Sequence, residues 1–195
     1  MGMVVEDGRV DMVHGKRFLE EFPKYREVLE KLYLKRELDN WYVDECRKPL
    51  VLPNELLNIK NTTVKIHDGF NPSSHVYLTL EELIGEGGFS LVQELQITIS
   101  KIIPVYHYVL LHKIKHPSLD GFLGLVGPAN SFAFIELEDY VNEIMRNNGY
   151  LELSDEYDMF DTVYEWVNLT NIDPVNRRLI LKDAVFVDIL ELCED

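Results

Sequence analysis

The sequence predicts a protein of the α+β class: a single domain, residues 1–195, with an N-terminal helix, a mixed or antiparallel sheet and a C-terminal β-hairpin. Helical and strand-like patterns both occur, but they do not alternate as regularly as in folds built on βαβ units. The length of 195 residues is normal for one domain, and 46% hydrophobic residues are enough for a core. Residues 1–15 are a candidate disordered segment.

The first predicted element is a helix in residues 16–40. Apolar side chains recur there at spacings of four, three, four and three, and so form one stripe: Phe18, Phe22, Tyr25, Leu29 and Leu32. Proline is favoured at the first position of a helix. We therefore expect a short turn followed by a helix from about Pro23.

The middle of the chain predicts short helices and strands. We expect a brief helix after Pro53, a strand over 62–68, a turn over 69–74 and a strand over 75–78. Thr79 and Glu82 have the spacing of a capping box, which predicts a second brief helix ending at Gly85. Residues 91–103 fit either state, whereas residues 105–116 are rich in β-branched and aromatic residues and predict a long strand.

The last third predicts a helix and a hairpin. A helix is expected over 132–147, because Asn148 and Gly149 form a stop signal. Residues 162–172 and 177–187 flank the turn-forming pair Asp173–Pro174 and predict a β-hairpin centred on the proline. A helix over 155–168 is the alternative, and we favour a strand from about Thr162.

The composition indicates a soluble, cytoplasmic protein. No apolar run approaches the ~20 residues that span a bilayer, and the N-terminus lacks the pattern of a secretory signal. The two cysteines, Cys46 and Cys193, have no spacing typical of a zinc or redox motif. We expect no metal and no cofactor.

The charge is distributed unevenly along the chain. The formal net charge is −15, and residues 117–195 hold 17 acidic residues and only four basic ones, whereas residues 1–116 are nearly balanced. Nucleic acids and anionic membranes present phosphates that need Lys and Arg, so neither is an expected partner. A protein with a basic surface would instead be attracted.

The stretch LIGEGGFSLV resembles the glycine-rich loop of protein kinases. Gly85, Gly87 and Val92 match the pattern GxGxxGxV, although Ser90 replaces the third glycine. The resemblance implies ATP binding, yet no HRD or DFG motif occurs anywhere in the chain. A helix is also expected to lead into the loop, where a kinase has a strand. We therefore interpret Gly85–Ser90 as a structural turn.

Histidines are the remaining candidates for catalysis or metal binding. His112 and His116 would share a face of a helix, but on a strand they lie ~13 Å apart, and His107 points to the other face. His67 and Asp68 are adjacent, yet their side chains diverge on a strand. No catalytic residue is predicted.

The segment 152–166 combines acidic and aromatic residues without any basic residue. It fails the spacing of a calcium loop. Charge that attracts a partner and aromatic side chains that anchor it are typical of binding surfaces. The predicted partner-binding residues are Glu152, Asp155, Glu156, Tyr157, Asp158, Asp161, Glu165 and Trp166.

The resulting hypothesis is a non-catalytic acidic protein that binds a basic protein partner, as inhibitors, immunity proteins and antitoxins do. The alternative is a small enzyme or ligand-binding domain whose pocket draws on His67, His75, His107 or His112.

Overall fold

The computed structural model describes residues 3–6, 9–12, 17–154, 157, 162–164 and 179–193. The chain forms two compact units. The first, here the helical unit, comprises Met1–Lys48, Phe70–Pro72 and Leu153–Asp195; the second, the sheet unit, comprises Pro49–Gly69 and Ser73–Glu152. The single-domain organisation and the disorder of residues 1–15 remain predictions.

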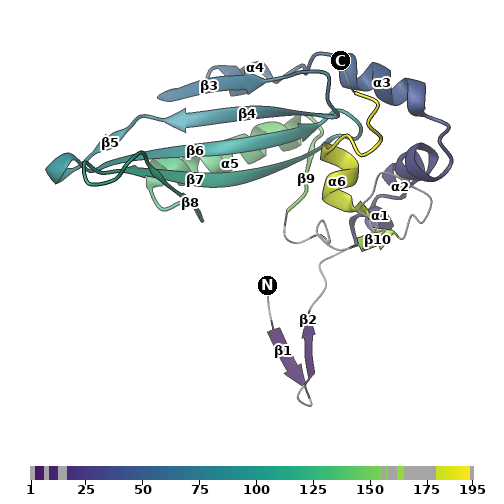
Figure 1. The fold of residues 1–195 in the computed structure, drawn as a ribbon, viewed down its shortest axis with the longest axis horizontal. Coiled ribbons are helices and arrows are strands. Elements are labelled where there is room, and N and C mark those ends of the chain that lie inside the picture. Colours follow the sequence, from purple (N-terminus) through teal and green to yellow (C-terminus); the bar gives the residue numbers. More distant parts are fainter. Residues whose placement is uncertain are drawn as a thin grey trace. The chain divides into compact units, whose positions relative to one another are not determined.

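The sheet unit contains one mixed sheet, which confirms the predicted α+β class. Its five principal strands follow one another in space with antiparallel neighbours (Figure 1): β3 (Thr62–His67), β4 (Ser73–Leu80), β6 (Ser90–Ser100), β7 (Val105–Lys115) and β8 (Leu123–Val126). Two short strands extend it: β5 (Leu83–Ile84) pairs antiparallel with β6, and β9 (Leu151–Glu152) pairs parallel with β7. The long strand expected over 105–116 is confirmed.

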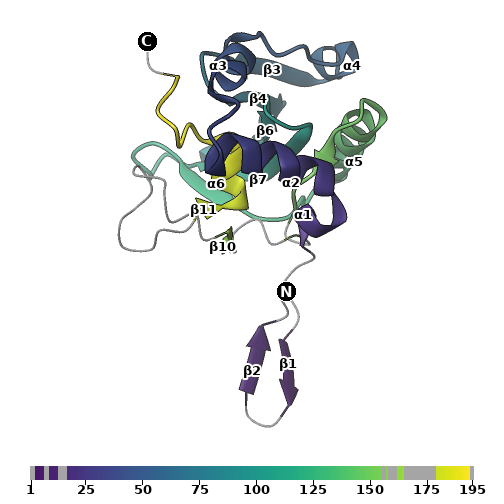
Figure 2. The same ribbon diagram turned by 90° about the vertical axis from the view of Figure 1, so that its right-hand side faces the viewer.

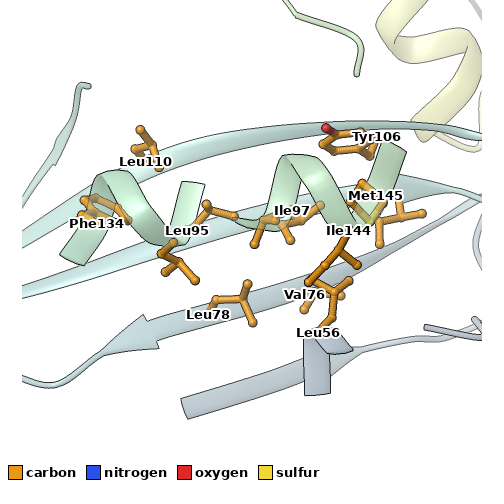
Figure 3. Close-up of a cluster of buried hydrophobic side chains, with 13 residues drawn as sticks. Leu56, Val76, Leu78, Leu95, Ile97, Tyr106, Leu110, Phe134, Ile144 and Met145 are labelled. Carbon is orange, nitrogen blue, oxygen red and sulfur yellow. The ribbon is translucent and has the colours of Figure 1, made fainter. Parts of the chain in front are cut away.

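One face of this sheet is covered by helix α5 (Phe132–Asn147), and the core lies between them (Figure 3). Successive side chains of a strand point to opposite faces, so alternate residues of β4, β6 and β7 enter the core. Leu56 of the short helix α4 (Asn54–Leu57) joins them. The helix expected after Pro53 is thereby confirmed.

Both ends of α5 follow the predicted signals. The Ser131 side chain accepts a hydrogen bond from the backbone N–H of Phe134, and so caps the first turn. Gly149 has φ of +83°, in the left-handed region where helices often stop. The helix predicted over 132–147 is confirmed at both boundaries.

The helical unit contains the predicted N-terminal helix in three pieces: α1 (Phe18–Glu21), α2 (Pro23–Leu29) and the π-helical turn η1 (Glu30–Leu34). It also contains α3 (Asp39–Arg47), which was not predicted, and α6 (Leu181–Phe186) of the C-terminal segment (Figure 2). Pro23 occupies the first turn of α2, as expected. Tyr33 donates to the Ala184 carbonyl at 2.6 Å, and Tyr42 donates to Asp188 at 2.9 Å. These bonds join residues far apart in sequence.

Two small antiparallel pairs complete this unit. β1 (Met3–Glu6) pairs with β2 (Arg9–Met12), and β10 (Thr162–Tyr164) pairs with β11 (Leu179–Ile180). The second pair agrees with the expected C-terminal hairpin and with a strand from Thr162. The turn predicted at Pro174 lies outside the described residues.

The short helix expected from Thr79 to Gly85 is wrong. Thr79 lies near the end of β4, paired with strands on both sides, and its hydroxyl donates to Glu94 of β6 at 3.1 Å. Glu82, the expected capping partner, instead accepts from the Ser90 hydroxyl at 2.6 Å. Strand pairing on both sides satisfies more backbone groups than a helix cap would.

The second strand of the hairpin is also shorter than expected. Among the described residues 179–187, Leu179 and Ile180 are paired as strand, and α6 follows directly. Leu181, Ala184 and Val185 are buried and recur at helical spacing, so burial of this stripe favours the helix.

Candidate functional site

The outer face of α5 carries a row of acidic side chains. Because α5 turns its apolar stripe to the sheet, residues three and four positions apart gather on its outer side. Glu136, Asp139 and Glu143 are exposed there, together with Tyr140. We call these four residues the acidic face.

Two basic residues lie near the acidic face: Lys60, which lines the same groove as Glu136, and Arg146, three residues after Glu143 in α5. Glu136, Asp139 and Glu143 have neither an ion pair nor a hydrogen bond from their side chains within the described part of the chain. Like charges at these spacings destabilise a helix by ~0.2–0.5 kcal/mol per pair. The face therefore combines an outward negative field with a small cost in stability.

A groove of about 530 Å³ adjoins the acidic face. Its walls come from the connection between α4 and β3, the end of β4 and the first turns of α5. Ile59, Leu80 and Leu137 supply apolar surface, and Glu136 and Tyr140 border it. This volume falls within the ~300–1,000 Å³ of typical ligand pockets. An extended side chain with an apolar stem and a charged head would fit it.

Three of the candidate histidines lie in one row on the sheet face opposite α5. In the strand register, His67 is opposite His75, His75 is opposite Thr98, and Thr98 is opposite His107. His75 Nδ1 lies 3.2 Å from the Thr98 hydroxyl, and the His67 ring packs 5.0 Å from that of Tyr77. Partial desolvation lowers the pKa of His75, and repulsion from His67 lowers it further.

His112 does not belong to this row. It is only 6% exposed on the face beneath α5, where its ring contacts Phe134 edge-on at 5.3 Å. Its Nε2 lies 3.1 Å from the Pro128 carbonyl, which can only accept, so Nε2 carries the proton. Nδ1 is then free to accept from Gln93. His112 is a hydrogen-bonded residue of the core.

Across the described ranges, no group of three or more His, Cys, Asp or Glu side chains is arranged to hold a metal ion. His116 lies beyond the end of β7, and its Nδ1 lies 2.6 Å from the Ser118 hydroxyl.

Asp68, the neighbour of His67, has a structural role. It forms an ion pair with Lys101 at 2.8 Å, and it accepts hydrogen bonds from the Ser74 hydroxyl and the Leu50 N–H. Desolvation works to raise the pKa of Asp68, but these partners together hold it below its ordinary value. The carboxylate thus joins three separate segments of the sheet unit.

The glycine-rich stretch is a turn, as interpreted from the sequence. Gly85 N–H donates to the Phe89 carbonyl at 2.8 Å, and Gly87 and Gly88 have φ of +69° and +81°. These glycines allow the chain to reverse between β5 and β6. The expectation that a helix leads into the loop is wrong, because the preceding element is a strand.

Most residues of the predicted partner-binding segment lie outside the described residues: Asp155, Glu156, Asp158, Asp161, Glu165 and Trp166. Glu152 is half-buried in β9. The Tyr157 ring packs edge-on against Phe18 at 5.2 Å and also lies near Phe22. Tyr157 therefore contributes to packing within the helical unit.

The acidic face is absent from the residues that the sequence predicts for partner binding, although it lies on the helix predicted over 132–147. Glu136, Asp139 and Glu143 recur at spacings of three and four, which places them on one side. This periodicity was the available signal.

Compared with known proteins, the chain matches no protein-family model, no curated protein and no solved structure. Among the helices that the structure describes, none has the length and apolar character required to cross a membrane.

Proposed function

We propose that this protein is a non-catalytic acidic protein that binds a basic protein partner, in the manner of inhibitors, immunity proteins and antitoxins. The observation that carries the proposal is the acidic face, where three carboxylates are exposed and form no ion pair with any described residue. The excess of acidic residues over 117–195 supports it. Such a field accelerates encounter with a positively charged surface.

The groove supplies a place for an anchoring side chain of the partner. The methylene stem of an Arg or Lys would lie along Leu80 and Leu137, and its charged head would meet Glu136, in competition with Lys60 of the same groove. The Tyr140 ring at the rim can stack on a guanidinium group. In this proposal, charge sets the rate of association and the groove sets the rate of dissociation.

The test compares charge reversals on the acidic face with charge reversals elsewhere in the chain. The partner is first captured from the source organism at low and high salt. Association is then measured for the triple variant Glu136→Lys, Asp139→Lys, Glu143→Lys. We expect the association rate to fall roughly tenfold or more and its dependence on salt to flatten, because electrostatic steering is lost.

The matched control is Glu21→Lys, Glu81→Lys, Glu86→Lys. These three glutamates are also exposed and lie in the balanced part of the chain, so the change in net charge is the same. The control variant should associate with the partner clearly faster than the Glu136, Asp139, Glu143 reversal variant. Equal rates for the two variants, or an acidic partner, would contradict the proposal.

The predicted segment 152–166 is tested in parallel. Asp155→Lys, Glu156→Lys, Asp158→Lys should also slow association if this segment contributes to the contact. Trp166→Ala should act mainly on the dissociation rate, because truncating an aromatic anchor removes short-range contacts. If only one of the two triple variants, that of the acidic face or that of segment 152–166, associates more slowly, the contact is assigned to the residues changed in that variant.

A second candidate function rests on the row of His67, His75 and His107. Three imidazoles in register on an exposed sheet face suit a small anionic ligand or acid–base chemistry. Histidine NMR titrations with phosphate and acetate would discriminate this function from the first. Saturable shifts of these three rings, absent for buried His112, would favour it.

A further inference from the structure

One end of the sheet unit presents an uncharged, apolar surface. Residues 121–135 contain no charged side chain, although they lie in the third of the chain that holds 17 acidic residues. Five large apolar side chains of this interval are about half exposed or more: Phe122 (57%), Leu123 (50%), Leu125 (47%), Val126 (71%) and Phe132 (88%). We call them the neutral patch. Exposed patches of this kind mark interaction sites.

The neutral patch is centred on an edge strand. β8 ends the principal strand path and pairs with β7 alone among the described strands (Figure 1). Gly127 N–H donates to the Leu110 carbonyl, so this pair is hydrogen-bonded. Because bonded and non-bonded pairs alternate, the N–H and C=O groups of Gly124 and Val126 point away from β7.

The two edges of the principal path differ in how they are protected. Proteins prevent unwanted pairing at an edge with charged side chains, proline or bulges. β3, at the opposite edge, exposes Lys65 and His67, whereas β8 reads LGLV and has none of these devices. As far as the described residues go, the β8 edge is therefore open to another strand.

We propose that a second copy of this chain pairs with the β8 edge, strand to strand and antiparallel, to form a symmetric dimer. The two-fold axis must stand perpendicular to the sheet, because only this axis brings one edge against itself in antiparallel orientation. Both copies then keep α5 on the same face of a continuous sheet. Residues that lie opposite one another in the two β8 strands must point to the same face of the sheet. In a register centred on Gly124, Phe122 of one copy lies opposite Val126 of the other. Leu123 then lies opposite Leu125.

Charge favours a second copy as the occupant. Two chains of net charge −15 repel one another, and the repulsion is weakest where each presents an uncharged surface. A basic partner would be drawn to acidic surfaces instead. An isologous contact also needs a self-complementary surface, which the apolar pairs of this register provide.

The exposed area matches what a modest dimer needs. If a large apolar residue exposes ~150–200 Å² when free, the neutral patch exposes roughly 500 Å² per copy, so a dimer buries at most roughly 1,000 Å² of it. This lies below the ~1,200–2,000 Å² of standard stable interfaces and in the range of weak ones. The expected dimer is therefore weak.

Sedimentation velocity of the full chain from 1 to 100 µM tests the proposal. The unmodified protein should dimerise, and Val126→Lys should weaken the dimer roughly tenfold or more, because each copy would bury a charge at the edge. Val51→Lys is the matched control: Val51 is 83% exposed, lies outside the neutral patch, and its replacement should leave dimerisation unchanged. Circular dichroism would verify that each variant folds.

A compensating variant tests the register. Phe122→Glu combined with Val126→Lys places opposite charges against one another twice in the dimer, and should recover affinity lost by Val126→Lys. A monomer at 100 µM, or a dimer that Val126→Lys leaves intact, would overturn the proposal. So would capture of a different protein by the β8 edge of a monomeric chain.

Discussion

At the scale of single residues, the ion pair between Glu94 and Lys113 is a main polar contact on the sheet face opposite α5. Glu94 is 7% exposed and accepts from Lys113 at 2.8 Å with both carboxylate oxygens. Gln96 and Thr79 also donate to it. Desolvation alone would raise the pKa of Glu94, but these donors hold it below its ordinary value of 4.5.

This arrangement predicts the effect of removing the lysine. Lys113→Met leaves a mostly buried carboxylate without its counter-ion, and should cost about 1–3 kcal/mol at pH 7, a range reduced because Lys113 is partly exposed. A depressed pKa contributes stability above pH ~4.5 that is lost as the pH falls through the folded value. The variant should lose this pH dependence. Denaturant unfolding at pH 7 and pH 4 measures both effects.

Lys65→Met is the control for this experiment. Lys65 is exposed on the same sheet face, in β3, so its loss should change stability little. Equal stability of Lys113→Met and the unmodified protein would show that the ion pair contributes nothing.

His75 predicts a pH dependence in the neighbouring range. Its folded pKa lies below the ordinary value of 6.5, so the unfolded chain binds the proton more readily. Stability should therefore fall as the pH drops from about 6.5 through the folded pKa. His75→Gln should make the loss between pH 7 and pH 5 smaller, as followed by thermal unfolding. An unchanged loss would contradict the prediction, and His116→Gln, at an exposed site, is the control.

At the scale of elements, Ser131 connects α5 to the sheet. Its hydroxyl accepts from Phe134 N–H and donates to Gln93 of β6 at 2.7 Å, and Gln93 in turn donates to Asn130 at 2.7 Å. The side chain thus caps the helix and satisfies a buried amide at once. The start of α5 is therefore held to β6 by side-chain bonds as well as by the apolar core.

Ser131→Ala should consequently cost about 1–2 kcal/mol, more than loss of an ordinary surface hydroxyl. The change removes an N-cap, and it leaves the Gln93 carbonyl oxygen without this donor. Denaturant unfolding measures the cost, and Ser131→Thr, which keeps the hydroxyl, should recover most of it. A loss of less than ~0.3 kcal/mol would show that water replaces both bonds.

At the scale of the whole molecule, the net charge of −15 should make stability depend on salt. Self-repulsion destabilises the folded state, and salt screens it. Raising sodium chloride from 10 to 150 mM should stabilise the protein by ~1 kcal/mol, or roughly 2–4 °C in Tm. The Glu136, Asp139, Glu143 reversal variant should show a smaller rise. A Tm that falls with salt would contradict the prediction.

Local patterns predicted the elements whose stabilising contacts are close in sequence. The boundaries of α5 follow from Ser131 and Gly149, and β7 follows from its β-branched and aromatic residues. The same reasoning failed at Thr79, whose hydroxyl is bonded to Glu94 of the adjacent strand. It also failed at residues 181–186, where burial against other segments decides the state.

The sequence by itself determined the fold class, the position of most elements and the accumulation of acidic residues after residue 117. Composition and periodicity are properties of neighbouring residues, and one chain displays them directly. Only the tertiary structure decided which side chains lie together: the register that aligns His67, His75 and His107, the groove beside Glu136, and the open edge of β8. Strand register depends on contacts between two segments that are far apart in sequence and meet only when the chain folds. The pattern of one segment alone therefore does not specify the register.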